Sequence, residues 1–423
     1  MFHTGTQHSW QTALAFQETG QLAWYATSIF YDPEKWPYRI ERFLPPGISQ
    51  RLHREMVRRY TPLLDPALVR IVSHGEWLRS LVRRYKLDRL DHLFARANVR
   101  LAAQATIRLL VDEPVDALWC YNSQAEYVFS SSRANGLLKI LDQTIGHPVA
   151  MDAALLPLAV ANWSGTNYRR FSPKWVRIQN HEVALADQVM VGSAFCGDTM
   201  IANGCAPDKL TVLPYGYDDA LAGAVRVRAV PAERPLKFIF VGTVEARKGA
   251  HLVIEAFRRI PPSVAEVTLV GRMVLPERAV RDLPVNIRHV PHVPRSAVGQ
   301  YLASADCFIF PSFFEGSALV LYEALGAGLG IIQTKSAGFG VVDGVNGIML
   351  AEATVETIHG ALRRVIADPS LITRWSRESI RLSQDYRWSD YRVRCRKLVD
   401  AHFAGTSQGM PPGRLDACLN DPD

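Results

Sequence analysis

Short apolar runs alternate with helix-compatible patterns along nearly the whole chain. These runs predict strands at residues 22–30, 117–122, 137–143, 189–193 and 211–216 in the first half, and at 236–242, 267–271, 287–291, 307–312 and 330–334 in the second. Strands that alternate with helices indicate βαβ units and parallel sheets. We therefore predict an α/β fold of two tandem Rossmann-like, doubly wound domains. Because ligands of such sheets lie beyond the carboxyl ends of the strands, the two domains are expected to face each other across a cleft.

The boundary between the two halves is predicted at residues 218–235, which contain two prolines and little strand or helix pattern. This linker would separate a first domain, residues 1–217, from a second domain, residues 236–384. A closing helix is predicted over residues 385–404. Residues 405–423 have the composition of a disordered tail.

The composition is that of an ordinary globular protein, with 48% apolar and 21% charged residues in 423. Its six cysteines form no CxxC pair and several lie in apolar runs, which favours a reducing cytoplasm over a disulfide framework or a zinc site. The N-terminal residues lack the features of a signal peptide. The longest apolar run has about 11 residues, fewer than the ~20 that span a bilayer, so no membrane-spanning segment is expected.

Basic residues are concentrated in one segment of the chain. Residues 51–108 contain 13 Lys or Arg against 5 Asp or Glu, whereas the whole chain has a net charge of +7. Leu, Val and Trp lie between the arginines at helical spacing, a pattern that suits the surface of an anionic membrane. A solvated helix face explains the same pattern. No recognised nucleic-acid-binding module accompanies the charge, so we expect no nucleic acid partner.

Two glutamates lie eight positions apart in the otherwise uncharged stretch "FIFPSFFEGSALVLYEALGAGLGII", residues 308–332. The stretch predicts a strand, a turn that contains Glu315, and a helix that contains Glu323. Three small residues follow Glu315 and permit close approach of the backbone. A carboxylate at such a position accepts hydrogen bonds from ligand hydroxyls. The alternative is a solvated helix glutamate and a favourable charge near a helix start.

A second corner between a strand and a helix, "FVGTVEARKGAHLVIEAF", carries cations. The strand ends at Gly242, the loop contains Arg247 and Lys248, and Gly249 begins a helix. Cations beside a helix N-terminus form a receptor for phosphate. The segment lacks the spacing GxxxxGK[ST], which excludes a Walker-type loop, and no GxGxxG follows any predicted strand, which argues against a nucleotide-linked oxidoreductase. A surface basic pair is the other interpretation.

The sequence resembles the retaining glycosyltransferases of family 4 (group 1), which have the GT-B fold. The resemblance lies in both corners, in the "LVG" between them, and in the earlier stretch "NHEVALADQVMVGSAFCGDTMIANGCAPDKLTVLPYGYD". The resemblance covers residues 180–400 well, residues 1–20 and 117–150 loosely, and residues 31–116 hardly at all. It implies a hexosyltransferase that moves a sugar from a nucleotide-diphosphate sugar to an acceptor with retention. It also implies that the only small molecule required is the donor substrate, with no cofactor, no metal and no enzyme nucleophile.

The resemblance implies a role for each matching residue. Glu315 would contact hydroxyls of the donor sugar, and Glu323 would hold the ribose of the nucleotide. Lys248 and Arg247 would neutralise the departing diphosphate. The other donor-binding residues that it implies are Gly5 in an N-terminal loop, Val293 near the nucleobase, and the backbone of Gly316, Ser317, Ala318 and Leu319.

The sequence departs from the family pattern at two places. Thr243 stands where the family often has an arginine, so either Arg247 compensates or phosphate binding is weaker. Asp142 and Gln143 close a strand where the family often has a histidine, and His147 follows a few residues later. His147 is therefore either an active-site group or an ordinary loop histidine.

The acceptor side would be built by the first domain, and above all by residues 31–116. The basic character of residues 31–116 suggests a lipid-linked or cell-surface glycan acceptor, as in polysaccharide biosynthesis. It also suggests peripheral contact with the cytoplasmic membrane face through residues 51–108. Two alternatives stay open: a nucleotide-sugar epimerase on the same fold, and a catalytically inactive nucleotide-sugar-binding protein. The sequence determines neither the nucleobase nor the sugar of the donor.

Overall fold

The computed structural model describes residues 1–5, 8–35, 38–56, 61–76, 79, 88–160, 168–218, 227–229, 234–291 and 293–408. Contacts within the chain divide it into two compact units. The first unit consists of Met1–Asp142, Arg177–Met190 and Arg392–Asp423, and the second of Gln143–Val176 and Val191–Tyr391. Residues 219–226 and 230–233 of the expected linker lie outside the described residues. The domain boundary at residues 218–235 thus stays a prediction.

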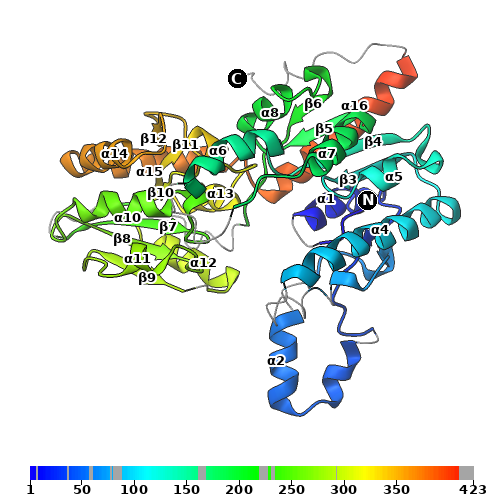
Figure 1. Cartoon of the computed structure of the whole chain (residues 1–423), viewed down its shortest axis with the longest axis horizontal. Coiled ribbons are helices and arrows are strands. Elements are labelled where there is room, and N and C mark those ends of the chain that lie inside the picture. Colours follow the sequence, from blue (N-terminus) through cyan, green and yellow to red (C-terminus); the bar gives the residue numbers. More distant parts are fainter. Residues whose placement is uncertain are drawn as a thin grey trace. The chain divides into compact units, whose positions relative to one another are not determined.

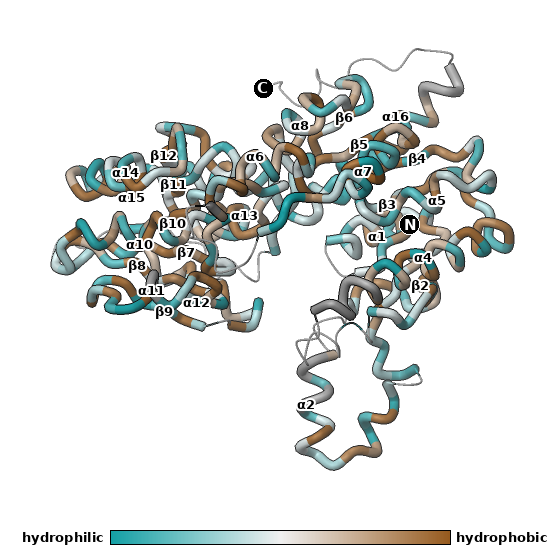
Figure 2. Tube along the Cα trace, viewed as in Figure 1, coloured by the Kyte–Doolittle hydropathy of each residue, from teal (hydrophilic) through white to brown (hydrophobic). Residues whose placement is uncertain are grey.

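The second unit contains a six-stranded parallel sheet in the order β12-β11-β10-β7-β8-β9 (Figure 1). Its strands are β7 Leu236–Val241, β8 Ala265–Val270, β9 Ile287–Val290, β10 Cys307–Phe310, β11 Gly330–Thr334 and β12 Gly347–Leu350. The five strands predicted in the second half of the chain are confirmed, and β12 is an additional edge strand. The strands carry apolar runs, drawn brown in Figure 2, because both faces of a parallel sheet are covered.

Helices cover this sheet, with α10 packed against α14 and α13 packed against α15. The helices of the unit are α6 Pro148–Val160, α8 Ala194–Ile201, α10 Ala250–Arg258, α11 Glu277–Val280, α12 Arg295–Ala303, α13 Leu319–Gly326, α14 Val355–Ala367 and α15 Ser370–Ser383. Its shorter elements are β6 Leu210–Val212 and the 3-10 turns η5 Pro207–Lys209, η6 Ala246–Lys248 and η7 Lys335–Ala337. Phe238, Phe240, Phe257 and Phe308 are fully buried in the core between sheet and helices.

The first unit is built around parallel strands that include the N-terminus. Phe2 forms parallel bridges to both Ala26 and Cys120, so the short apolar run at the start of the chain lies between two strands. The strands are β1 Tyr25–Thr27, β2 Val69–Ile71, β3 Ala117–Tyr121, β4 Leu138–Gln143 and β5 Gln188–Val191. Strand β1 pairs with β2, and β3 pairs with β4, both in parallel.

The helices of the first unit are α1 Ser9–Gln17, α2 Pro46–Met56, α4 Asp88–Asp112 and α5 Glu126–Phe129, with most of α7 Pro173–Leu185 and α16 Trp388–Gln408. Its 3-10 turns are η1 Tyr38–Phe43, η3 Pro66–Leu68 and η4 Ser132–Ala134. Helix α16 packs against α1 through Arg396, which pairs with Glu18 at 2.8 Å. The closing helix thus runs to Gln408, four residues into the predicted tail, and residues 409–423 lie outside the described part of the chain.

The basic segment is described only in part. Residues 57–60, 77, 78 and 80–87 lie outside the described residues. The remainder of residues 51–108 contributes the end of α2, strand β2 and most of α4. Within the described chain, no helix has the length and apolarity needed to cross a bilayer.

Candidate functional site

The cationic corner of the second unit lies at the carboxyl end of strand β7. The chain leaves β7 at Gly242, forms the turn η6, and enters helix α10 at Gly249. Gly249 has a φ of 70°, and a Cβ atom there would lie 2.2 Å from the carbonyl oxygen of Pro311. Because no side chain fits at this position, glycine allows this corner to pack directly on the corner that follows β10.

The acidic corner that follows β10 is fastened to the cationic corner by the main chain of Arg247. The carbonyl oxygen of Arg247 accepts hydrogen bonds from the N–H of Phe313 at 2.8 Å and from the hydroxyl of Ser312 at 3.2 Å. On its other side, the N–H of Glu315 donates to the carbonyl oxygen of Ser336 at 3.0 Å. These bonds fix the backbone on both sides of the Glu315 side chain.

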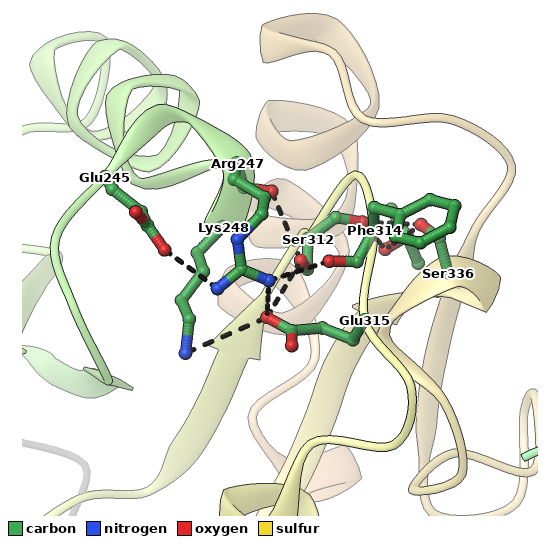
Figure 3. Close-up of polar contacts among 8 residues, drawn as sticks. Glu245, Arg247, Lys248, Ser312, Phe314, Glu315 and Ser336 are labelled. Atoms are coloured by element: carbon green, nitrogen blue, oxygen red, sulfur yellow. Dashed lines mark hydrogen bonds and ion pairs between the residues drawn. The ribbon is translucent and has the colours of Figure 1, made fainter. Parts of the chain in front are cut away.

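The structure brings Glu315, Arg247 and Lys248 together (Figure 3). Glu315 Oε1 lies 2.8 Å from the Arg247 guanidinium and 3.7 Å from Lys248 Nζ. Arg247 also pairs with Glu245 at 2.9 Å and donates to the carbonyl oxygen of Phe314 at 2.8 Å. Burial lowers the pKa of Arg247, but the carboxylates of Glu315 and Glu245 outweigh it, and the pKa is raised above its ordinary value. The guanidinium is therefore a fixed cation.

A cavity of about 590 Å³ adjoins this cluster at the carboxyl ends of β7 and β8. It is lined by Val241, Gly242, Thr243, Lys248, Val270, Gly271, Arg272, Val293, Arg295 and Val298. Among these described lining residues three are cationic and none is acidic. Apolar walls that carry three cations suit an anionic ligand with an apolar or aromatic part.

Glu323, in helix α13, contacts one of the residues that line the cavity. Its carboxylate is 6% exposed and pairs with the guanidinium of Arg295 at 3.2 Å. Burial raises the pKa of Glu323, and the charge of Arg295 opposes that shift. Glu315 and Glu323 thus each contact a cation that lines the cavity, Lys248 for one and Arg295 for the other.

The small residues between the two glutamates pack against the chain itself. A Cβ atom on Gly316 would lie 1.9 Å from the carbonyl oxygen of Thr144. The hydroxyl of Ser317 is 2.8 Å from that of Tyr322, and the N–H of Ala318 donates to Ala337 at 3.2 Å. Helix α13 begins at Leu319. Packing within the unit accounts for glycine at 316, and contact of this backbone with a diphosphate stays a prediction.

Val293, Gly5 and His147 lie in three different settings. Val293 lines the cavity, and contact of its backbone with a nucleobase stays a prediction. Gly5 belongs to the first unit, where its N–H donates to His3 Nδ1 at 3.2 Å. His147 is 2% exposed, and its Nδ1 accepts from the N–H of Val149 at 3.3 Å, at the start of α6. This contact fits a helix-starting residue, and a role for His147 in an active site stays untested.

Sequence reasoning missed Arg272 and Arg295. Arg272 directly follows Gly271 at the end of β8, just as Thr243 directly follows Gly242 at the end of β7. Compensation by Arg247 was one of the two expectations for Thr243, yet the Arg247 side chain is engaged by two carboxylates, whereas Arg272 lines the cavity beside Thr243. The arginine after "LVG" was the available signal. Arg295, the first residue of α12, has no distinctive sequence context.

Among the described residues, no group of three or more His, Cys, Asp or Glu side chains could hold a metal ion. The described site has three carboxylates, those of Glu245, Glu315 and Glu323, and each of them contacts a cation from the chain. Its chemistry is therefore that of an anion receptor flanked by hydroxyl acceptors.

The comparison that decides the family concerns residues 225–381, which match the model of the glycosyl transferases group 1 family. Residues 225–381 are a group 1 glycosyltransferase domain. This domain contains the whole cluster of Glu315, Arg247 and Lys248 and all the residues that line the cavity. The resemblance seen in the sequence is thus confirmed at the level of group 1, and the finer assignment to family 4 stays a prediction.

Curated relatives agree with the group 1 assignment. The chain is 30% identical over 217 residues to a glycogen synthase of Mycobacterium tuberculosis, which covers 48% of this chain and 51% of the relative. It is 27% identical over 238 residues to a D-inositol 3-phosphate glycosyltransferase of Xylanimonas cellulosilytica, which covers 50% of this chain and 57% of the relative. The chain thus spans about half the length of the curated relatives that it matches.

Solved structures confirm the fold. HepE of Anabaena, solved with UDP-glucose, matches with a TM-score of 0.60 at 13% identity, over 95% of this chain and 98% of HepE. Sucrose-phosphate synthase of Thermosynechococcus elongatus matches with a TM-score of 0.59 at 16% identity, over 73% of this chain and 79% of the synthase. The predicted α/β fold of the GT-B type, with parallel sheets covered by helices, is confirmed.

Proposed function

We propose that this protein is a retaining glycosyltransferase that moves a hexose from a nucleotide-diphosphate sugar to a glycan acceptor without a metal ion. The observation that carries this proposal is the contact of Glu315 with Arg247 and Lys248 beside a cavity lined by three cations. The group 1 domain supports it, as do relatives named as glycosyltransferases. HepE, which shares the fold, was solved with UDP-glucose.

Electrostatic stabilisation of the leaving group would carry the reaction. When the bond between the anomeric carbon and the diphosphate oxygen breaks, positive charge develops on the sugar and negative charge on the diphosphate. Lys248, Arg272 and the N-terminus of α10 would stabilise that negative charge. The acceptor oxygen would bond to the anomeric carbon on the same face, and its proton would pass to the departing phosphate oxygen.

The carboxylates would orient the donor. Glu315 would accept hydrogen bonds from sugar hydroxyls close to the reacting carbon, while its contacts with Arg247 and Lys248 hold the carboxylate in place. Glu323 would accept from the ribose hydroxyls, which requires it to share its charge between the ribose and Arg295. A fixed arrangement of this kind lowers the entropy lost in reaching the transition state.

A thermal-shift panel tests donor binding. The protein would be heated with UDP, GDP or ADP and with their glucose and mannose derivatives. A ligand at 100 times its Kd adds about 2.7 kcal/mol to the free energy of unfolding. We expect one nucleotide series to stabilise the protein strongly and Lys248→Ala to abolish that shift. The matched control is Lys237→Ala, which removes a lysine from the other end of β7 and should leave the shift intact. A panel in which no compound stabilises the protein would contradict the proposal.

Product analysis separates the proposal from its two alternatives. A transferase releases the nucleoside diphosphate when donor and acceptor are both present. An epimerase on the same fold would convert the donor sugar to its isomer without that release. A catalytically inactive binding protein would bind the donor and change nothing.

A lipid-linked or cell-surface glycan acceptor, reached from the cytoplasmic membrane face, completes the proposal. Its basis is the charge of residues 51–108 and a neighbouring apolar tip, where Phe43 is 81% and Ile48 57% exposed. Phe43 ends η1 and Ile48 belongs to α2. Binding to vesicles of anionic lipid should be strong at low salt and weaken as salt screens the charges. Equal binding to neutral vesicles, or none to anionic vesicles, would argue against a membrane-bound acceptor.

A further inference from the structure

The loop that follows strand β3 in the first unit has an unusual backbone. Strand β3 ends at Tyr121, and two residues later Ser123 has a φ of 72°, which side-chain-bearing residues rarely adopt. Such conformations persist only where the surroundings enforce them, and they cluster at functional sites. The loop also emerges at the carboxyl end of a parallel strand, where doubly wound sheets bind ligands.

A buried glutamate from helix α7 holds this loop. Glu182 has no exposed surface, and its carboxylate accepts hydrogen bonds from the N–H groups of Ser123 and Ala125 at 2.8 Å and of Glu126 at 3.1 Å. The side chain of Gln179 donates a fourth bond, at 3.2 Å. Burial raises the pKa of Glu182 to about 7, against the three backbone N–H groups that lower it. One carboxylate thus binds three backbone N–H groups within the four residues 123–126 of the loop.

The loop in turn holds the N-terminal segment that contains Gly5. The side-chain oxygen of Gln124 accepts the N–H of Thr4 at 2.7 Å. Phe2 runs parallel to β3 through its bridge to Cys120, so the residues after Phe2 and the residues after β3 leave the sheet at the same edge. Hydrogen bonds therefore lead from the carboxylate of Glu182 to the loop at 123–126, and from Gln124 to the backbone next to Gly5.

We propose that Glu182 is a positioning residue that acts through Gln124 to set the backbone of Thr4 and Gly5 for the transfer reaction. This inference rests on the proposed function and on the prediction, made from the family resemblance, that Gly5 approaches the donor. Gly5 has no side chain, so its place depends on its backbone: its own N–H donates to His3, and the N–H of the adjacent Thr4 donates to Gln124. Glu182 supplies that anchor because it belongs to a helix and has no exposed surface.

The experiment compares Glu182→Gln, Gln124→Ala and the double variant with the wild type. Glu182→Gln keeps the shape of the side chain but places an NH₂ group against N–H donors. The matched control is His181→Gln, which removes the exposed contact of His181 with Glu126 at 3.1 Å between the same two helices. The readouts are hydrogen exchange at the Thr4 amide, and kcat and KM for release of UDP from UDP-glucose.

We expect Glu182→Gln and Gln124→Ala each to speed exchange at Thr4 and to lower kcat about 10- to 100-fold, with KM nearly unchanged. The double variant should be no worse than the poorer single variant, because both residues act through one path. His181→Gln should behave as the wild type. Unchanged exchange at Thr4 in Glu182→Gln, additive losses, or faster exchange with an unchanged kcat would each overturn the inference.

Failure of the proposed function gives a different result. If UDP-glucose is not turned over, the Thr4 exchange in the single and double variants still decides whether Glu182 positions this backbone through Gln124. If Lys248→Ala leaves turnover unchanged while Glu182→Gln lowers kcat, the donor site is wrong and the positioning residue stands.

Discussion

Most of the proposed chemistry depends on Glu315, because its carboxylate contacts both Arg247 and Lys248. Replacing it with glutamine keeps the shape and removes the charge. We expect Glu315→Gln to lower kcat/KM about 10- to 100-fold, the usual worth of a hydrogen bond to a charged group. The control is Glu356→Gln, which removes an exposed carboxylate that pairs with Arg259. Steady-state kinetics in which both variants match the wild type would exclude Glu315 from the reaction.

His251 gives the domain a pH dependence that can be measured without substrate. The imidazole is 2% exposed and stacks on Phe313 at 6.0 Å, and burial lowers its pKa to about 4. The unfolded chain has a histidine pKa of about 6.5, so the folded state favours the neutral ring. The contribution of His251 to the free energy of unfolding is complete above pH ~6.5. It is lost as the pH falls towards 4, by up to about 3 kcal/mol.

Chemical unfolding at several pH values tests this role of His251. In the wild type the free energy of unfolding should fall between pH 6.5 and 4, and in His251→Gln it should fall distinctly less. Other buried histidines contribute to both curves, so the difference between the two proteins isolates His251. Parallel curves would show that His251 titrates alike in the folded and unfolded chains.

At the scale of elements, the packing of two corners on each other depends on Gly249. Alanine at this position meets both the φ of 70° and the carbonyl oxygen of Pro311 at 2.2 Å. We expect Gly249→Ala to destabilise the domain by more than 1 kcal/mol and to weaken nucleotide binding, because the corners must separate. The control is Gly360→Ala, within α14, where the new Cβ meets no atom within 4 Å. This variant should leave the free energy of unfolding unchanged or raise it by about 0.5–1 kcal/mol. Thermal unfolding with and without UDP measures both effects. Equal stability and equal stabilisation by UDP in the two variants would contradict this role of Gly249.

The elements also show how far the sequence could be read. All ten predicted strands are present because each is an apolar run of strand length between turn residues. Strand β2 was missed because its sequence, VRI, has a charged residue at its centre, and β12 because its sequence, GIML, directly follows the turn residues of "DGVN". The pairing of Lys248 with Glu315 could be foreseen, since both follow parallel strands. Arg272 follows β8 and Arg295 follows β9, so they join the site because the strand order is β7-β8-β9, which local sequence does not give.

At the scale of the molecule, the proposed reaction divides between the two compact units. The cationic cavity, Glu315 and Glu323 all belong to the second unit. The loop of Gly5, with its anchor Glu182, belongs to the first. Nucleotide binding should therefore survive changes in the first unit that reduce turnover. Calorimetry of UDP binding to Glu182→Gln checks this expectation, and a large loss of affinity would contradict the division.

The central claim is that Lys248 and the cavity beside it bind the diphosphate of a nucleotide sugar. Calorimetric titration measures how much the second phosphate adds to affinity. The ligands are the monophosphate and the diphosphate of uridine, guanosine and adenosine. For at least one nucleoside we predict that the wild type binds the diphosphate at least 10-fold more tightly than the monophosphate, and that Lys248→Ala loses most of this difference. A ratio that is the same in both proteins, or no binding of any diphosphate, would contradict the account.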